Sequence, residues 1–313
     1  MRNLYSLLLG LLFFALLALP LLAGGGKKIL SKDPAASWQD IGDTFVLKTK
    51  DGNVTLSKED YICGVVAAEM PALYETEALK AQAVAAYTYA VRCSAASDEE
   101  WDLTDDSKIH QAYIDEAARR EKWGENAETY EKKIREAVNA VLGQCIIYEG
   151  EPIFAAYHAI SSGRTETALN VWGNDLPYLC GVESVFDKQH ENYKSEVVVP
   201  LDDFCKKLSL EKPADTSAVT SKIERSTAGT VLSFSVFRKT FSGGDIREAF
   251  GLRSANFTFE YKDGSIKFTV LGYGHGVGMS QFGANCLAKE GKTYKEILLW
   301  YYPGTTIEQK PSP

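Results

Sequence analysis

The sequence predicts an α+β protein of mixed helices and antiparallel strands, arranged as one large domain or as two lobes. Its 313 residues are 45% hydrophobic and 24% charged, which is an ordinary globular composition. An uncharged, alanine-rich stretch between Ala81 and Val91 indicates a buried central helix. Strand-like runs separated by Asp-Gly and Glu-Gly pairs indicate several hairpins.

The chain opens with an apolar segment in residues 1–26. The run from Leu4 to Ala23 carries no charge and is long enough to cross a bilayer. Small residues after it would also suit cleavage of a signal peptide, and the flanking charges are few. We favour an uncleaved membrane anchor, and either alternative exports the rest of the chain. A linker is expected at residues 27–43, an exported domain at residues 44–308 and a tail at residues 309–313.

The central helix is predicted from a four-residue repeat. Leu79, Ala83, Tyr87 and Val91 recur at the helical period. Small residues on the other faces let neighbouring elements pack closely, so we expect the helix inside the core.

The remaining elements follow from turn signals and periodicity. In chain order they are a hairpin over 45–56 that turns at Asp51-Gly52, helices over 108–122 and 127–142, strands over 145–158 around Glu149-Gly150, strands within 196–245, a hairpin over 257–270 that turns at Asp263-Gly264, and helices over 281–289 and 294–301. Pro303-Gly304 ends the last helix.

Glu69 stands just upstream of the central helix, inside the apolar run VVAAEM and shortly before Pro71. A carboxylate among valines and alanines costs free energy unless it is paired or held protonated by a raised pKa. A raised pKa is what a general acid needs near neutral pH. The alternatives are that Glu69 caps the helix or pairs with a buried cation.

Charge and cysteine usage exclude several classes of protein. The formal net charge is -8, which gives nucleic-acid binding no electrostatic support, and an anionic polymer would need a local basic patch. Six cysteines are scattered without a CxxC pair, which argues against a zinc ribbon or a small disulfide scaffold. One or two disulfides remain open, and Cys63 is expected to be a buried apolar residue.

Two histidines occupy distinctive settings. His158 opens HAISSGRTE, a loop of small residues with serines, an arginine and a glutamate, and His275 lies in the glycine-rich GYGHGVG. Those glycines would allow a ligand to approach the backbone closely. Each histidine could equally be structural.

The sequence lacks the residue patterns that several other kinds of active site require. The glycine-rich stretch does not match a phosphate loop, no GxSxG is present, and four scattered histidines suggest no metal cluster. A glycosidase ordinarily needs two carboxylates across a groove, but only Glu69 stands in an apolar setting, with Glu166 or Asp175 as a second acid that folding could supply. A single acid suits a reaction whose nucleophile comes from the substrate itself.

Five separated motifs together resemble the stage II sporulation protein D family. They are VVAAEMP; EALKAQAVAAYTYA; YHAISSGRTE with VWGNDLPYL; FSGGDIREAFGLRS; and GYGHGVGMSQFGA with WYYPGT, in this order between about residues 45 and 307. Agreement of all five is far more specific than any one motif.

The resemblance implies a lytic transglycosylase that cleaves peptidoglycan glycan strands during sporulation engulfment. It implies an anchor in the mother-cell membrane, with the domain outside the cytoplasm and facing the forespore, and a cell-wall amidase and a membrane engulfment complex as partners. The matching glutamate, Glu69, would act first as acid and then as base, leaving a 1,6-anhydro-muramic end. No cofactor is implied. Some relatives carry a Cys-His zinc pair, but only His110 stands in that stretch here, so no metal is expected.

The same resemblance places a substrate groove beside the central helix, lined by the His158 and His275 loops. The expected substrate-binding residues are Tyr157, His158, Ser161, Ser162, Arg164, Glu166, Tyr273, His275, Ser280 and Gln281. Tyr157, Tyr178 and Tyr273 are possible sugar platforms, although tyrosines more often pack in the core. Family members act on strands stripped of stem peptides, and Arg164 is the candidate for binding a free lactyl carboxylate.

The chain departs from the family at Tyr87, where the family usually has an arginine. Arg92 is more than one turn further on and is a doubtful substitute on the same face. The departure brings charge support for Glu69 into question. The departure also leaves open a non-catalytic glycan-binding enhancer of a cell-wall amidase. A muramidase that uses water is a third alternative.

Overall fold

The computed structural model describes Trp38, residues 41–214, Val219 and residues 221–309. The apolar N-terminal run, and the anchor predicted there, lie outside the described residues. Within the described part, no helix combines the length and apolar character that a membrane span requires.

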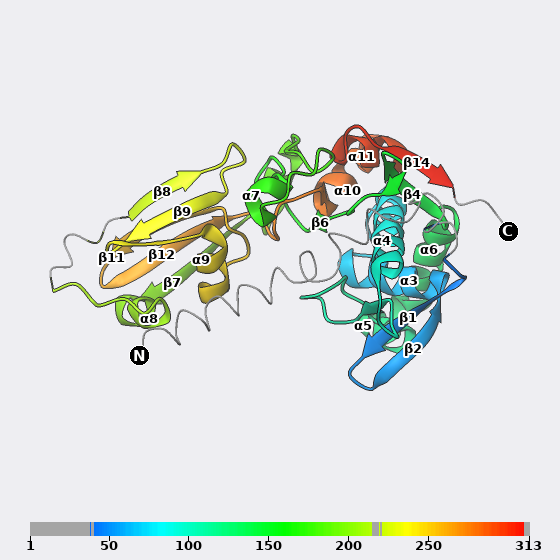
Figure 1. The fold of residues 1–313 in the computed structure, drawn as a ribbon, viewed down its shortest axis with the longest axis horizontal. Coiled ribbons are helices and arrows are strands. Elements are labelled where there is room, and N and C mark those ends of the chain that lie inside the picture. The colour runs from blue at the N-terminus through cyan, green and yellow to red at the C-terminus, as the bar shows by residue number, and fades with distance from the viewer. Residues whose placement is uncertain (1–37, 39–40, 215–218, 220, 310–313) are drawn as a thin grey trace.

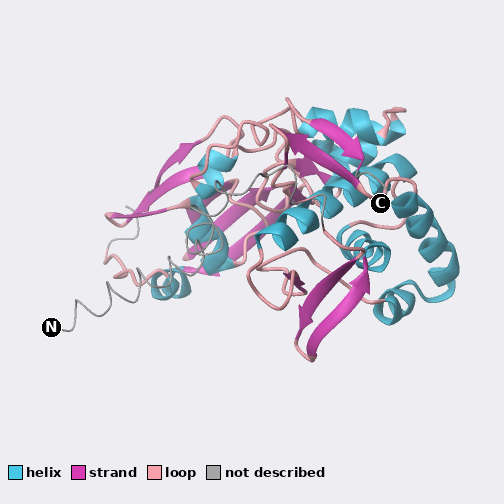
Figure 2. Cartoon of the chain, turned by 45° about the vertical axis from the view of Figure 1, so that its right-hand side comes forward, coloured by secondary structure: helices cyan, strands magenta, loops and turns pink. Residues whose placement is uncertain are grey.

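The chain folds into a helical lobe and a strand-rich lobe that lie next to each other (Figure 1). Each lobe has its own apolar core. The core of the helical lobe draws on residues 38–179 and again on residues 277–302, whereas the other core lies within residues 199–270. The predicted α+β class is confirmed, and the strand-rich lobe is inserted into the sequence of the helical one. Figure 2 shows most of the helices on the right-hand side of the molecule.

The helical lobe is built around two consecutive helices. Its elements are β1 (Thr44–Thr49), β2 (Gly52–Ser57), α3 (Lys58–Glu69), α4 (Thr76–Ala96), β3 (Leu103–Thr104), α5 (Glu116–Trp123), η1 (Gly124–Asn126), α6 (Ala127–Asn139), β4 (Gln144–Tyr148), β5 (Glu151–Pro152), β6 (Tyr157–His158), α10 (Gln281–Lys289), α11 (Tyr294–Tyr301) and β14 (Thr306–Gln309). Helix α4 contacts α3, α6, α10, α11 and β4, and is the predicted central helix.

Local chemistry explains where α3 begins and ends. The side chain of Ser57 accepts a hydrogen bond from the Asp60 amide and caps the N-terminus. Pro71 disfavours helical backbone at Met70, which is extended, with φ -123° and ψ 146°. The helix therefore stops at Glu69 and leaves this side chain at its C-terminal end.

The prediction of a helix over 108–122 is wrong in its first half. Helix α5 starts only at Glu116, after an N-cap in which Asp115 accepts a hydrogen bond from the Ala118 amide. The residues before it run without regular structure along α3, where Ile114 N donates to the Gly64 carbonyl at 3.4 Å. Tertiary contacts thus override the local helical pattern.

The strand-rich lobe contains two three-stranded antiparallel sheets and two short helices. Its elements are β7 (Lys194–Pro200), α8 (Leu201–Lys207), β8 (Ser221–Arg225), β9 (Val231–Val236), β10 (Lys239–Phe241), α9 (Gly243–Phe250), β11 (Phe257–Lys262) and β12 (Ser265–Leu271). The sheet orders are β10-β9-β8 and β11-β12-β7. The hairpin predicted at Asp263-Gly264 is confirmed, with Phe259 opposite Phe268, whereas α8 and α9 were not predicted.

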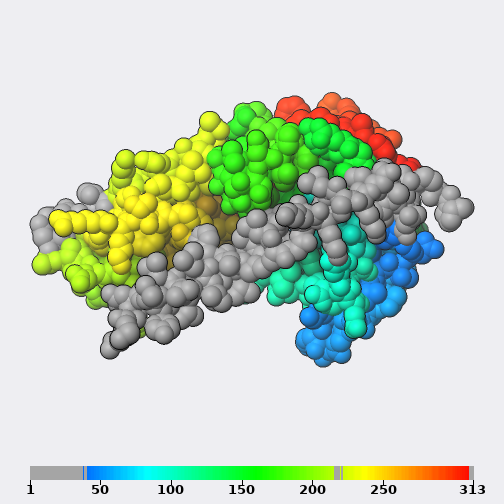
Figure 3. Space-filling model, viewed as in Figure 1, coloured from blue at the N-terminus to red at the C-terminus, as the bar shows by residue number. Residues whose placement is uncertain are grey.

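Two motif-bearing segments cross between the lobes and lie against each other. They carry α7 (Ala168–Trp172), η2 (Val185–Gln189) and β13 (Met279–Ser280), and β13 pairs in parallel with β6. Figure 3 shows the middle of the chain, coloured green, between the two lobes. Gly278 has φ +72°, and a Cβ there would lie 1.9 Å from the Ala156 carbonyl oxygen. At Gly278, then, the close neighbour is the chain's own backbone rather than a ligand.

Candidate active site

Glu69 is half-buried at the end of α3 and has two hydrogen-bond donors. Its Oε1 accepts from the Ala112 amide at 3.2 Å, and its Oε2 accepts from Gln281 Nε2 at 3.1 Å. Among the described residues, no cation forms an ion pair with this carboxylate, and the N-cap of α4 is Glu75. Both structural alternatives for Glu69 are therefore absent from the described structure. Burial raises the pKa of Glu69, although the two hydrogen bonds oppose that shift.

A cavity of about 240 Å³ opens in front of Glu69. Its lining residues are Glu69, Pro71, Tyr74, Ala159, Ile160, His190, Asn192, Arg253, Tyr273 and Gln281. Glu69 is the only Asp or Glu in this lining among the described residues. The cavity is smaller than the roughly 300–1,000 Å³ typical of sites for drug-sized ligands, so it suits a single ring or group of a larger substrate.

Gln281 is the first residue of α10, and its position depends on the turn before it. Ser280 caps that helix by accepting from the Gly283 amide at 3.1 Å. Gln281 Nε2 also lies 3.5 Å from Oε1 of Gln82, a fully buried residue of α4. Within the described structure, Nε2 of Gln82 has no hydrogen-bond partner. Gln281 and Glu69 thus meet at the wall of the cavity, with Gln82 buried behind them.

A second polar layer lies behind Glu69. Gln111 Nε2 donates to Tyr61 Oη at 3.2 Å, and Tyr157 Oη donates to Gln111 Oε1 at 2.7 Å. Burial raises the pKa of Tyr157 well above its usual range, and Glu69 adds to that effect. Tyr157 therefore lies near Glu69 but does not line the cavity. Its hydroxyl helps to hold the segment that carries Ala112.

Asp187, which the sequence reasoning missed, joins three segments beneath the cavity. It is fully buried, and its two oxygens accept from the Ser161 amide and from Ser280 Oγ, each at 2.8 Å. Burial raises the pKa of this carboxyl group, against the effect of its hydrogen bonds. Through Ser280, Asp187 positions the start of α10 and hence Gln281. Its only sequence signal is an acid that directly follows two apolar residues, in VFD.

His158 and His275 lie together, but away from the Glu69 cavity. Their ring centroids are 5.7 Å apart, and Trp172 packs 5.0 Å from His275. His158 Nδ1–H donates to the Val277 carbonyl, and the Val277 amide donates to His275 Nδ1. Burial lowers the pKa of His158 to about 4 and that of His275 to about 3, so both rings are neutral near pH 7.

The other polar residues of the His158 loop also lie outside that cavity. Ser162 Oγ donates to the Ala228 carbonyl at 2.7 Å, and Arg164 pairs with Glu183 at 2.6 Å. Glu166 accepts from the Thr167 amide and from Asn170 Nδ2, each at 2.8 Å, and also from Ser226 Oγ. With Ser161 and His275, these residues line a second cavity of about 20 Å³, which has room for little more than a water molecule.

Two of the three possible sugar platforms, Tyr157 and Tyr178, do not line the Glu69 cavity. Tyr178 is buried, and its hydroxyl accepts from the Phe154 amide at 3.2 Å, as expected for a core residue. Tyr273 is 48% exposed and lines the Glu69 cavity. Of the residues expected to bind substrate, the structure brings Tyr273 and Gln281 together with Glu69. Ser280 lies directly behind them.

Position 87 does not face Glu69. Tyr87 Oη accepts from Lys58 Nζ at 3.2 Å, and Lys58 is the first residue of α3. Glu69 is the eleventh residue after Lys58 along the helix, which corresponds to about 16 Å. Because position 87 lies far from Glu69, the replacement of the family arginine by Tyr87 does not remove a charge from the neighbourhood of Glu69. Arg92 also lies elsewhere, donating to the Pro152 carbonyl at 2.7 Å.

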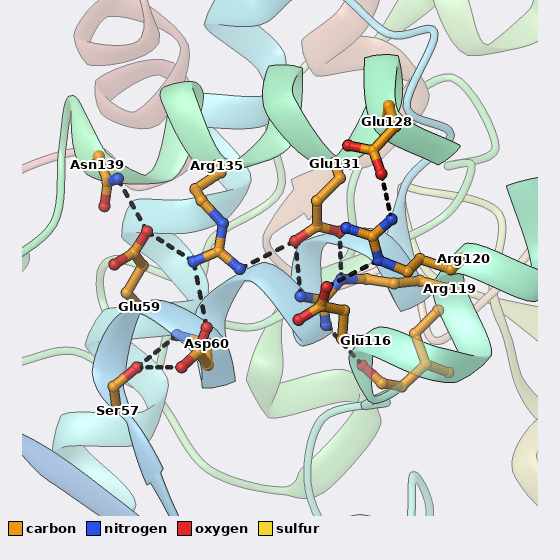
Figure 4. A network of polar contacts seen from close by, with 11 residues as sticks. Ser57, Glu59, Asp60, Glu116, Arg119, Arg120, Glu128, Glu131, Arg135 and Asn139 are labelled. Carbon is orange, nitrogen blue, oxygen red and sulfur yellow. Dashed lines mark hydrogen bonds and ion pairs between the residues drawn. The ribbon is translucent and has the colours of Figure 1, made fainter. Parts of the chain in front are cut away.

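A network of charged residues fixes α3 against α5 and α6 (Figure 4). Arg119, which is 1% exposed, donates two hydrogen bonds to Glu131, at 2.6 and 2.8 Å. Arg135 pairs with Glu131 at 3.0 Å and with Glu59 at 2.8 Å. These contacts fix the helix that ends in Glu69 relative to the segment that carries Ala112.

The described residues contain no cluster of three His, Cys, Asp or Glu side chains suited to a metal ion. They also contain no disulfide, and Cys63 is buried, as expected.

Comparison with known proteins gives concordant matches. A sequence model of the family described as Stage II sporulation protein matches residues 50–148. The chain is 42% identical to Stage II sporulation protein D of Bacillus subtilis (strain 168), over 80% of this chain and 74% of that protein. It is 37% identical to Stage II sporulation protein D of Bacillus amyloliquefaciens, over 85% and 79% of the two chains. It is also 29% identical to an amidase enhancer of Bacillus subtilis (strain 168), over 78% of this chain and 40% of that protein.

Proposed function

The chain belongs to the stage II sporulation protein D family, and on that premise we propose that it is a peptidoglycan lytic transglycosylase acting during sporulation. The bond cleaved joins N-acetylmuramic acid to N-acetylglucosamine. The observation that carries the proposal is a single acid, Glu69, in a cavity with no second carboxylate among the described lining residues. Hydrolytic glycosidases ordinarily place two carboxyl groups across the bond, whereas one suffices when the sugar supplies its own nucleophile.

Burial provides the protonation state that the first step needs. Because the pKa of Glu69 is raised, the carboxyl group keeps its proton closer to neutral pH than an exposed glutamate would. Glu69 transfers this proton to the glycosidic oxygen as the bond from that oxygen to C1 breaks. The Gln281 side chain and the Ala112 amide then stabilise the carboxylate that forms.

The second step returns the proton to the enzyme. The C6 hydroxyl of the muramic acid unit attacks C1, and the carboxylate of Glu69 takes the hydroxyl proton. A 1,6-anhydro ring closes, Glu69 is protonated again, and no water is consumed. Tyr273, exposed at the cavity edge, offers a flat surface for a sugar ring.

A membrane anchor in residues 1–26, the domain at 44–308 and a location facing the forespore form part of the same proposal. So do a cell-wall amidase and an engulfment complex as partners. The amidase enhancer among the relatives favours a second candidate function, in which the chain binds glycan and stimulates an amidase without cleaving the strand itself. The half-buried, hydrogen-bonded Glu69 favours catalysis.

Mass spectrometry of glycan fragments tests the proposal. The full-length protein and its Glu69→Gln variant would be incubated with peptide-free glycan strands. We expect anhydro-muramic ends from the wild type and their loss in the variant, which keeps the size of the side chain but not the acid. Reducing ends would show hydrolysis instead. A wild type that leaves strands intact but stimulates an amidase, equally well with Glu69→Gln, would support the enhancer.

A further inference from the structure

We propose that Arg253 binds the free lactyl carboxylate of the N-acetylmuramic acid unit that reacts at Glu69. This assignment rests on the proposed function and adds to it the residue that recognises the substrate's charge. It also gives a structural reason for acting on strands without stem peptides, because a stem peptide converts that carboxylate into a neutral amide.

Arg253 is the only Lys or Arg among the described residues that line the Glu69 cavity. It lies in the loop after α9, so the strand-rich lobe supplies this cation to a cavity whose acid comes from the helical lobe. Its guanidinium carbon lies 5.4 Å from the centroid of the Tyr273 ring, a distance at which cation–π attraction holds it in place.

The guanidinium retains binding capacity. Nη1 lies 3.4 Å from both the carbonyl oxygen and Oδ1 of Asn192, and both contacts are long for hydrogen bonds. Among the described residues, no carboxylate forms an ion pair with Arg253. An arginine has five N–H donors in a fork that matches two carboxylate oxygens, so most of its donors stay available to a ligand.

Arg164, the arginine expected from the sequence to meet the lactyl group, already has a carboxylate partner. Its Nη1 pairs with Glu183 and its Nη2 donates to the Gly181 carbonyl, each at 2.6 Å. It also lines the cavity of about 20 Å³, which is too small for a sugar. Of the two arginines, only Arg253 shares a cavity with Glu69.

The charge balance of the protein makes a local cation necessary. The formal net charge is -8, so the protein as a whole repels an anionic glycan. In the cavity, a protonated Glu69 adds no charge, and Arg253 leaves the site cationic. A lactyl carboxylate therefore gains electrostatic attraction in the cavity, whereas a neutral amide does not.

Binding measurements without cleavage test the assignment. The Glu69→Gln protein would be titrated calorimetrically with peptide-free glycan strands and with the same strands after their lactyl carboxylates are converted to methylamides. We expect the acid strands to bind roughly 10- to 100-fold more tightly, as a charge-assisted hydrogen-bonded pair allows. The double variant Glu69→Gln/Arg253→Gln should bring this ratio close to one. Adding Arg238→Gln instead, at an exposed arginine of the same lobe, should preserve it.

The readout separates this assignment from the proposed function. Equal affinity for acid and methylamide strands with Arg253 intact overturns the assignment. Failure to bind either kind of strand overturns it as well. So does loss of the ratio in Glu69→Gln/Arg164→Gln while Glu69→Gln/Arg253→Gln keeps it. A wild-type protein that does not cleave, but whose Glu69→Gln form prefers acid strands through Arg253, would refute the transglycosylase and leave the carboxylate site standing.

Discussion

The raised pKa of Glu69 makes a prediction about stability that does not depend on activity. The folded protein holds this proton at pH values where the unfolded chain, with a glutamate pKa near 4.5, has already released it. The unfolded state therefore binds fewer protons in that window, and stability falls as pH rises through it. Glu69→Gln removes the titration while keeping the shape of the side chain.

The size of the effect follows from one proton. Between pH 4.5 and the raised pKa, the wild type should lose at most about 1.4 kcal/mol per pH unit relative to the variant. Below this window the two proteins should differ by a constant amount, and above it the difference should reach a plateau. We therefore expect the stability of Glu69→Gln relative to the wild type to be higher near pH 7 than at pH 4.5.

Urea unfolding at intervals of half a pH unit from 4.5 to 8, followed by tryptophan fluorescence, measures this difference. Glu121→Gln is the control, since Glu121 is an exposed glutamate on α5. Its stability difference from the wild type should show no such rise. Parallel curves for the wild type and Glu69→Gln, or a difference that shrinks with rising pH, would refute the claim that burial holds this carboxyl group protonated.

Three further predictions concern the residues that support the site. Glu131→Gln should lower the free energy of unfolding by about 3–5 kcal/mol because it leaves the Arg119 charge buried without a partner. Arg119→Met should lower it less because Glu131 still pairs with Arg135, and urea unfolding of both variants ranks them. Gly64→Ala should cost about 1–3 kcal/mol and reduce cleavage, since its Cβ would meet Tyr113 at 2.3 Å and the Ile114 carbonyl at 2.7 Å and push away the segment that carries Ala112. Gly42→Ala, with nothing within 4 Å of its Cβ, is the matched control in the same unfolding and cleavage assays. Asp187→Asn should cost about 1–3 kcal/mol by weakening the bonds from Ser161 and Ser280, and should lower kcat more than it raises KM because it displaces Gln281; unchanged kinetics would show that Asp187 acts on folding alone.

Local chemistry was readable from the sequence. The turns at Asp51-Gly52 and Asp263-Gly264, the central helix and the helices near the C-terminus all occur where periodicity and turn residues predicted them. Glu69 could be singled out because a lone acid in an apolar run is costly wherever the chain folds. Each of these inferences depends on neighbours within about one or two turns of the chain.

Contacts between residues that are far apart in the sequence could not be predicted in this way. The serines and charged residues of the His158 loop and the rings of His158 and His275 are conspicuous in the sequence, yet they hold the crossing segments together. Arg253 and Asp187 are inconspicuous, yet they lie at or beneath the Glu69 cavity. The α-helical pattern over 108–115 gave way to hydrogen bonds with α3.

By itself, then, the sequence determined the α+β class, the secondary elements around each turn, the family resemblance and the one acid whose surroundings are costly. Only the tertiary structure decided which residues share a cavity with that acid. Glu69, Gln281 and Arg253 are separated by long stretches of chain and come from different elements. Their meeting depends on how two lobes pack, and packing is set by the summed contacts of both cores rather than by any local pattern.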